Sequence, residues 1–338
     1  MITPPVLHLA SNENPLGMPP AAREAAAQAL GRCDRYPDGT GAALRAALSQ
    51  RLGVPADWIV LGSGSSEILT LAAHALVAPG QGVVSSQYGF LVYAQAARLV
   101  HARHAVVAAR DHGHDLDAMH AAIDADTRLV FVANPNNPTG SFLSGDALSA
   151  FLERVPAHAV VLLDEAYTEY LAPAQRYDSM AWVRRFPNLL VARTFSKAWG
   201  LAGLRIGFGV AQPALAARLD AVRPRFNVST PALAAAEAAL ADEDFLQRSR
   251  AINQQGREQL ARGLAALGLR CLPSAGNFVM VALGDAAAAH AAALAREGIL
   301  VATLQAYGLA HWLRISVGLP EQNERVLQAL AALQPAPA

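Results

Sequence analysis

The chain has 338 residues, of which 53% are hydrophobic and 16% are charged. This length and composition suffice for one large domain or two moderate ones with extensive buried cores. The 27 basic and 27 acidic side chains cancel. No block of like charge occurs, so nothing indicates a nucleic-acid or anionic-membrane partner. The composition favours a globular protein with a site for a small ligand.

Cysteine content and hydropathy indicate in which cellular compartment the protein is expected. Cys33 and Cys271 are the only cysteines, too few for a disulfide framework or a cysteine-based zinc site. The N-terminal stretch MITPPVLHLASNENP has neither a basic start nor a long apolar stretch. No run of about 18 apolar residues occurs elsewhere. We therefore expect a cytoplasmic protein that is neither secreted nor membrane-spanning.

Short β-rich runs alternate with alanine-rich helical patterns over the first 230 residues, which is typical of parallel strands joined by crossover helices. Strands are expected at 58–62, 83–86, 128–133, 159–165, 188–193 and 205–210. Helices between them include 65–77, 89–100, 115–123 and 144–155. The runs VFV and VVLL are apolar throughout, as in strands covered on both faces. This pattern predicts an α/β domain with a mostly parallel sheet.

The pattern changes after about residue 230. One long helix is expected at 231–267, followed by apolar runs at 278–283, 299–302 and 312–317 and a last helix at 320–332. We interpret this part as a smaller α/β unit. The first 30 residues hold proline-rich loops and one helix, too little to fold alone. The expected division is an N-terminal arm that packs with the small domain, a large domain and a small C-terminal domain, at residues 1–30, 31–232 and 233–338.

The motif GSGSSE joins the first expected strand to a helix. Backbone N–H groups and the positive end of the helix give this turn the character of a phosphate site. An ordinary glycine turn with serine caps explains the motif equally well when it is taken alone. It lacks the third glycine of a dinucleotide fingerprint, and no GxxxxGK[ST] occurs, so the common nucleotide folds lose support.

Three further motifs, ANPNNPTG, LDEAY and TFSK, each follow or close an expected strand. Because ligands of doubly wound sheets bind outside the carboxyl ends of the strands, one pocket would hold Asn137, Asp164, Tyr167 and Lys197. This set suits an aldehyde-bearing pyridine cofactor: the amine condenses with the aldehyde and the carboxylate keeps the ring nitrogen protonated. The phenol and the amide would bond the ring's phenolic oxygen. Its phosphate would be held by the GSGSS amides with Arg205, Ser196 and Thr194.

Six motifs between residues 11 and 325 resemble, in order, those of the fold-type I pyridoxal-phosphate-dependent aminotransferases, most closely the histidinol-phosphate aminotransferase branch. They are SNENPLG, YPDGTGAALRAAL, ANPNNPTG, LDEAY, TFSKAWGLAGLRIG and LRISVGLPEQNER. The resemblance spans nearly the whole chain. It implies a large domain with a mostly parallel seven-stranded sheet sandwiched by helices, plus a smaller α/β C-terminal domain. It also implies pyridoxal 5′-phosphate as the cofactor, a small-molecule amino donor and a 2-oxo acid acceptor.

Site residues follow from the same resemblance. Lys197 would bind the cofactor covalently and shuttle the proton of the substrate, with a depressed pKa in a water-poor pocket. Asp164 would pair with the ring nitrogen, while Tyr167 and Asn137 would bond the 3′ oxygen. The phosphate would be held by Ser65, Ser66, Thr194, Ser196 and Arg205. Phe90 aligns with the aromatic residue that stacks on the ring.

Tyr36, in YPDG, matches a tyrosine that reaches the phosphate of the neighbouring subunit, which implies a homodimer with shared active sites. Arg314 matches the arginine that binds the substrate's acidic group, for which a planar fork is suited. Asn14 is assigned to the substrate pocket, although Asn12 and Asn14 are equally compatible with fixing a turn.

Structural roles are the alternatives for several of these residues. Tyr167 and Phe90 are compatible with the core, Arg205 and Arg314 with salt bridges, and Asp164 with a strand-end cap. His112 and His114 lie in a loop without a matched ligand set, so we expect solvated histidines and no metal site.

Ala302 stands where histidinol-phosphate enzymes commonly carry an arginine. The loss of one charge-assisted hydrogen bond to a phosphate costs about 1.5–3 kcal/mol. The leading interpretation is transfer of the amino group of histidinol phosphate to 2-oxoglutarate, giving imidazole acetol phosphate and glutamate in histidine biosynthesis. An aromatic amino-acid aminotransferase and an amino-acid decarboxylase of the same fold are the alternatives, because the same electron sink stabilises a carbanion whichever bond breaks. A non-catalytic protein that kept the fold is a third class.

Overall fold

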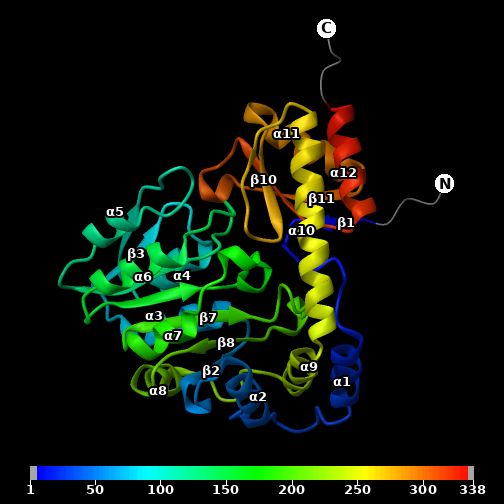
Figure 1. The fold of residues 1–338 in the computed structure, drawn as a ribbon. Helices are drawn as coiled ribbons and strands as arrows, with labels where there is room; N and C mark the ends of the chain where they lie inside the picture. The colour runs from blue at the N-terminus through cyan, green and yellow to red at the C-terminus, as the bar shows by residue number, and fades with distance from the viewer. Residues whose placement is uncertain (1–5, 334–338) are drawn as a thin grey trace.

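The computed structural model describes residues 6–333. Within this range seven strands form one large sheet in the order β2-β8-β7-β6-β5-β3-β4, and β8 alone runs antiparallel to its neighbours (Figure 1). The strands are β2 (Ile59–Gly62), β3 (Gly82–Ser86), β4 (Arg103–Val107), β5 (Thr127–Ala133), β6 (Val160–Asp164), β7 (Leu189–Thr194) and β8 (Gly207–Val210). The expected mostly parallel, seven-stranded sheet is confirmed.

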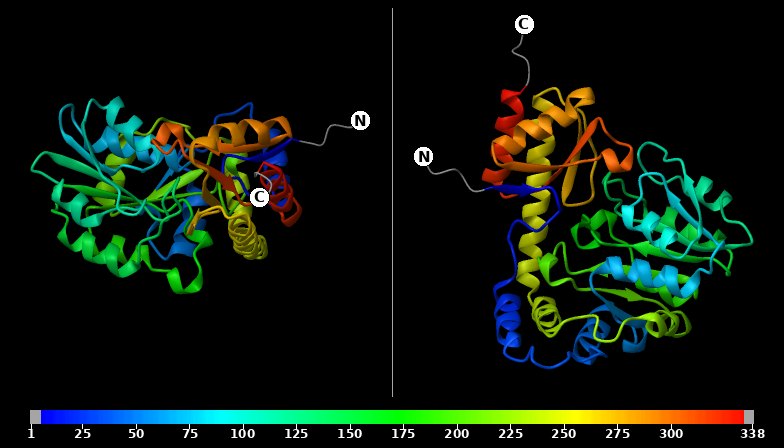
Figure 2. Two further views of the ribbon diagram at one scale, coloured as in Figure 1. Left: turned by 90° about the horizontal axis from the view of Figure 1, so that it is seen from above. Right: turned by 180° about the vertical axis from the view of Figure 1, so that it is seen from behind.

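Helices cover both faces of this sheet (Figure 2). One face packs against α3 (Ser65–Leu76), α4 (Leu91–Leu99) and α8 (Pro213–Val222). The other packs against α2 (Ala42–Leu52), α5 (Leu116–Ala121), α6 (Gly145–Arg154), α7 (Ser179–Arg185) and α9 (Thr230–Ala241). Strand β5 is an example of a strand that is buried on both faces. Leu129 and Phe131 pack against the first layer of helices, and Val130 and Val132 pack against the second. Burial of each apolar side chain of this kind contributes about 1.5–3 kcal/mol to the free energy of unfolding.

A second, five-stranded sheet has the order β1-β11-β12-β10-β9. Its strands are β1 (Leu7–Leu9), β9 (Cys271–Leu272), β10 (Phe278–Ala282), β11 (Ile299–Thr303) and β12 (Trp312–Ser316). It is covered by α10 (Glu243–Ala266), α11 (Ala287–Arg296) and α12 (Pro320–Ala332). Strand β1 pairs in parallel with β11, so the arm adds an edge strand to this small sheet. Helix α1 (Pro20–Leu30) instead lies against α9 (Figures 1 and 2).

The single long helix predicted at 231–267 is wrong. Two helices, α9 and α10, are separated at Asp242, whose backbone is not helical (φ −92°, ψ 73°). The Asp242 carboxylate accepts a hydrogen bond of 2.9 Å from the N–H of Phe245, so it caps the start of α10. Helix α10 extends for about 36 Å and connects α9 with the small sheet (Figure 1).

Three strands, β1, β4 and the two-residue β9, were missed in the sequence. Strand β4 is a half-exposed edge strand with an arginine and a histidine, and β1 has three residues, so neither forms a long apolar run. The strand expected to begin at 205 begins at Gly207, because Arg205 adopts a left-handed backbone (φ 53°).

Short 3-10 helices occupy several connections. They are Ala56–Trp58, Thr168–Tyr170, Pro173–Gln175, Ala202–Leu204, Gly284–Ala286 and Gln305–Tyr307. No helix in the described range is both long and apolar enough to cross a bilayer.

Candidate active site

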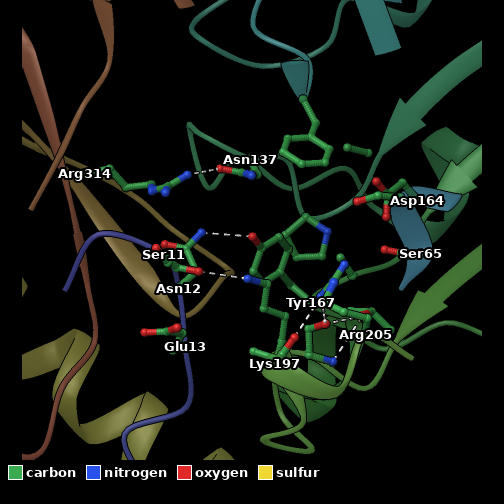
Figure 3. A pocket seen from close by; sticks show the side chains of 18 of the residues that line it. Ser11, Asn12, Glu13, Ser65, Asn137, Asp164, Tyr167, Lys197, Arg205 and Arg314 are labelled. Atoms are coloured by element: carbon green, nitrogen blue, oxygen red, sulfur yellow. Dashed lines mark hydrogen bonds between the residues drawn. The ribbon is translucent and has the colours of Figure 1, made fainter. Parts of the chain in front are cut away.

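A cavity of about 420 Å³ lies where the carboxyl ends of β5, β6 and β7 face strand β12 and the N-terminal arm (Figure 3). Eleven of the predicted residues line it, ten assigned to the cofactor and one to the substrate: Ser65, Ser66, Phe90, Asn137, Asp164, Tyr167, Thr194, Ser196, Lys197, Arg205 and Arg314. The arm adds Ser11, Asn12 and Glu13. The parallel sheet therefore gathers the strand-end motifs in one place, as its topology requires.

Lys197 lies in the loop that follows β7. Its Nζ donates a 3.0 Å hydrogen bond to the carbonyl oxygen of Ser11 (Figure 3). Burial, and next the positive charge of Arg314, lower the pKa of the amine to about 8. About a tenth of the amine is therefore neutral at pH 7, far more than for an exposed lysine, and nucleophilic attack requires this neutral form.

Asp164 is the last residue of β6, and the residue is 5% exposed. The hydroxyl of Tyr93 donates a 2.9 Å hydrogen bond to its Oδ2, whereas Oδ1 has no partner among residues 6–333. Burial raises the pKa of Asp164 to about 6. A buried carboxylate oxygen beside a cavity requires a donor, and a protonated pyridine nitrogen is such a donor. Asp164 thus fits a pyridine cofactor.

An anion site forms at one end of the cavity. Helix α3 begins there with Ser65 and Ser66, so its free N–H groups and positive end point to the cavity. The guanidinium of Arg205 donates to Ser196 Oγ at 3.3 Å. Gly64 (φ 79°) leaves room for this guanidinium, which would collide with any Cβ at that position. The cation, the hydroxyls and the helix end together suit a phosphate group.

The opposite end of the cavity contains Arg314 and Asn137 (Figure 3). Arg314 donates through Nη2 to the carbonyl of Ala10 at 2.7 Å and through Nη1 to Asn137 Oδ1. Between the two ends, the hydroxyl of Tyr167 accepts a 2.9 Å bond from Asn12 Nδ2. Burial raises the pKa of Tyr167 to about 12, so this phenol stays protonated at neutral pH.

Three predicted residues differ in their position relative to the cavity: Phe90 lines it, whereas Tyr36 and Asn14 lie outside it. Phe90 lines the cavity with its ring edge-on to Tyr93, at 6.1 Å between centroids. Tyr36 lies outside the cavity of its own chain; it is 82% exposed and stacks on Phe226 at 4.7 Å. Asn14 is also outside and donates to the carbonyl of Ala198 at 2.9 Å, beside Lys197. The predicted roles of these residues in binding stay predictions.

Sequence reasoning did not place Tyr93 or Tyr307 in the cavity that both line; Asn12 was weighed as a residue bordering the substrate pocket or fixing a turn, and its bond to Tyr167 was missed. For Tyr93 a signal existed, because it follows Phe90 by three residues at the start of a helix, where such residues share a face. No local signal identifies the partner of Asn12, since Tyr167 is 155 residues away in the chain.

The expectation of a solvated loop histidine is wrong for His114. Its side chain is buried, and its Nε2 lies 3.1 Å from the N–H of Ala133 at the end of β5. Burial lowers the pKa of His114 to about 4, so the ring is neutral and structural. Across the described residues no group of three or more His, Cys, Asp or Glu side chains could hold a metal ion.

Comparison with known proteins assigns the family. Residues 4–330 match the family model of aminotransferase class I and II, so the chain belongs to this family and is an aminotransferase. It is 59% identical over 328 residues to histidinol-phosphate aminotransferase 2 of Ralstonia nicotianae, covering 96% of this chain and 88% of the relative. It is 57% identical over 328 residues to histidinol-phosphate aminotransferase 1 of Cupriavidus pinatubonensis, and this match covers 96% of this chain and 87% of the relative.

A solved structure is similar over nearly the same length. The crystal structure of histidinol-phosphate aminotransferase from Sinorhizobium meliloti in complex with pyridoxal-5′-phosphate superimposes with a TM-score of 0.89 at 31% identity. The match covers 97% of this chain and 91% of that chain.

Proposed function

We propose that the protein is a pyridoxal-phosphate-dependent aminotransferase that moves the amino group of histidinol phosphate to 2-oxoglutarate, in histidine biosynthesis. One observation carries the chemistry: a buried carboxylate oxygen that has no donor among residues 6–333, an amine of lowered pKa and an anion site line the same cavity. The substrate is inferred from the names of the relatives that are 57% and 59% identical to this chain.

Pyridoxal phosphate, when bound, supplies an aldehyde for the lysine amine and a ring that accepts electrons from the substrate. The protein's own groups then have distinct tasks. Arg205 and the hydroxyls of Ser65, Ser66, Thr194 and Ser196 bind the phosphate. Asp164 keeps a proton on the ring nitrogen. Tyr167 and Asn137 bond the ring oxygen, and Phe90 packs against the ring.

Lys197 has two tasks in this proposal. Its neutral amine would hold the cofactor, and once a substrate amine has replaced it, the freed amine would take the proton from the substrate's α-carbon and deliver it to the aldehyde-derived carbon of the cofactor, on the other side of the amino nitrogen. Its pKa of about 8 suits both directions of this proton transfer near neutral pH. Burial, the main cause of the lowered pKa, also keeps water from competing for the proton.

Arg314 binds the acidic group of the substrate in this proposal. It is the cavity-lining cation that the small sheet provides, and its Nε lacks a partner among the described residues. Ala302 lies directly opposite Arg314 in the pairing of β11 with β12, so this neighbouring position adds no second charge. A single arginine therefore orients the phosphate or carboxylate of the substrate, with Asn137 beside it.

We further propose a cytoplasmic homodimer in which Tyr36 of one subunit contacts the phosphate site of the other. The exposure of two stacked aromatic rings, Tyr36 at 82% and Phe226 at 41%, supports a contact surface at this position. The proposed division into an arm, a large domain and a small domain is supported by the two separate sheets and by the pairing of β1 with β11.

An amino-donor screen tests the substrate. Histidinol phosphate, tyrosine, phenylalanine and aspartate are each supplied with 2-oxoglutarate, and both glutamate and CO₂ are measured. We expect glutamate from histidinol phosphate at the highest kcat/KM, without CO₂. A preference for the aromatic amino acids, or release of CO₂, would replace the proposed reaction by one of the alternatives.

The attachment site is tested independently of the substrate. Lys197 is the only lysine among the 338 residues. Reduction of the yellow holoprotein with borohydride should therefore fix one cofactor per chain on the peptide that contains Lys197. Lys197→Ala should abolish turnover and this label, while Lys197→Arg controls for the loss of positive charge. A label on any other peptide would contradict the assignment.

A further inference from the structure

Three consecutive residues of the N-terminal arm each hold one group of the cavity. The carbonyls of Ala10 and Ser11 accept hydrogen bonds from Arg314 and Lys197, at 2.7 and 3.0 Å. The side chain of Asn12 donates to the hydroxyl of Tyr167 at 2.9 Å (Figure 3). This segment follows β1 directly, so the small sheet fixes its position.

Asn12 is held more firmly than its position in a loop suggests. It is 1% exposed and has a left-handed backbone (φ 56°). Its N–H donates to Ser316 Oγ at 2.8 Å, and its carbonyl accepts from Asn277 Nδ2 at 2.9 Å. A non-glycine residue keeps such a backbone only where its surroundings specify it. Both partners belong to the small sheet or its flank.

The hydrogen-bond network also fixes which way the Asn12 amide points. Ser316 Oγ accepts the backbone N–H of Asn12 at 2.8 Å and donates its own proton to Asn12 Oδ1 at 3.2 Å. With Oδ1 bonded to Ser316, the amide nitrogen faces Tyr167 and donates to its hydroxyl. A phenol has one proton and can accept as well. Because Asn12 occupies its oxygen as a donor, Tyr167 keeps its own proton for an acceptor in the cavity.

We propose that Asn12 is a positioning residue: it fixes Tyr167 as a hydrogen-bond donor toward the ring oxygen of the bound cofactor and so stabilises that oxygen as an anion. This inference rests on the proposed function, because it requires pyridoxal phosphate in this cavity. Strand β12 carries both Arg314, which lines the cavity, and Ser316, which orients Asn12. The strand that binds substrate therefore also orients the contact to the cofactor.

The test is a pH titration of the holoprotein, followed by its visible absorbance, which reports the protonation of the cofactor bound to Lys197. The midpoint of this titration does not depend on turnover. In Asn12→Asp a carboxylate of similar shape replaces the amide and can only accept, so Tyr167 turns its proton away from the cavity. Because the anionic ring oxygen then lacks a donor, the cofactor holds its proton more tightly, and the midpoint of the absorbance titration should rise by about one pH unit. Tyr167→Phe should raise it by a similar amount.

The double variant separates this route from a direct effect of the added charge. If Asn12 acts through Tyr167, Asn12→Asp adds little to the midpoint once Tyr167→Phe is present, because coupled residues are not additive. Asn188→Asp is the matched control: Asn188 bonds the carbonyl of Ala159 at 2.9 Å, far from the cavity, and should leave the midpoint unchanged. Asn12→Gly, which tolerates the left-handed backbone, should give a smaller rise and is the substitute if Asn12→Asp does not fold.

Two results would overturn the inference alone. In the first, Asn12→Asp raises the midpoint equally in the wild-type protein and in the Tyr167→Phe variant. In the second, neither Asn12→Asp nor Asn12→Gly changes the midpoint, although Tyr167→Phe raises it. A wild-type protein that binds no cofactor would instead overturn the proposed function, and the inference with it.

Discussion

Asp164 is a buried carboxylate in an environment that disfavours its charge. Burial is the main cause of its raised pKa, about 6 against 3.8 for an exposed aspartate, and the bond from Tyr93 only partly opposes it. A ring N–H at the free Oδ1 would supply the missing donor. The free energy that this charge costs the cofactor-free protein is thus regained when the ring binds.

We predict that Asp164→Asn stabilises the cofactor-free protein above about pH 6. Because the folded-state pKa of about 6 exceeds the unfolded value of 3.8, the native state binds more protons between them, and stability falls as pH rises through this window. At about pH 8 the amide should add on the order of 3 kcal/mol, and close to nothing at about pH 4. Urea unfolding at the two pH values measures this difference.

The same variant should lose nearly all transaminase turnover when loaded with pyridoxal phosphate, because an amide does not keep the ring nitrogen protonated. Asp164→Glu, which retains the charge, serves as the control for the turnover measurement. Equal unfolding free energies of wild type and Asp164→Asn at both pH values would show that the carboxylate is not destabilising.

At the residue scale, the chemical groups were predictable and their partners were not. Lys197, Asp164 and Arg205 could be placed because each stands at or near a strand end in a motif. The bond from Tyr93 to Asp164 joins residues 71 apart, and the bond from Asn12 to Tyr167 joins residues 155 apart. Such contacts depend on the packing of helix α4 and of the arm; the spacing from Phe90 indicates which face of α4 Tyr93 is on, but no local pattern identifies its partner Asp164 or that of Asn12.

At the scale of elements, apolar periodicity predicted the buried strands and failed where burial is incomplete. Strand β6 is buried throughout, and β5 and β7 are buried at every residue but one, so all three contain apolar runs; the edge strand β4 is half-exposed and contains none of comparable length. The break between α9 and α10 was hidden because good helix formers stand on both sides of Asp242: an alanine-rich run precedes it, and Glu243, Leu246 and Gln247 follow it. The capping aspartate ends one helix and starts the next despite the helix propensity around it.

We predict that Asp242→Ala destabilises the protein by about 1 kcal/mol, because the first turn of α10 loses the acceptor for the N–H of Phe245. Chemical denaturation should show a lower midpoint with an unchanged m-value. Asp242→Asn is the matched control and should keep most of the stability, since asparagine caps helices about as well. Equal losses in both variants would assign the effect to charge and not to capping.

At the scale of the whole molecule, the cavity needs both sheets and the arm. The large sheet supplies Asp164 and Lys197, the small sheet supplies Arg314, and residues 10–12 bond to the groups of both. The fold class was predictable from the alternation of strands and helices. The placement of the small sheet over the strand ends was not, because it depends on the pairing of β1 with β11 across some 290 residues of chain.

The proposed sharing of sites between subunits can be tested by mixing two defective variants. Tyr36→Ala removes the residue that would reach the partner's phosphate site, and Lys197→Ala removes the amine. A hybrid dimer contains one site with both residues intact if Tyr36 acts across the interface. With random reassociation, half of the dimers are hybrids, so about a quarter of all sites are complete.

Turnover is measured at a cofactor concentration that leaves the Tyr36→Ala homodimer mostly empty. We expect the mixture to regain about a quarter of the wild-type rate, well above either variant alone. A mixture of Asp164→Ala with Lys197→Ala is the matched control: both side chains line the cavity of their own chain, so hybrids hold no complete site and no rate should return. Recovery in neither mixture would show that Tyr36 does not complete the partner's site, and its exposed ring would then need another explanation.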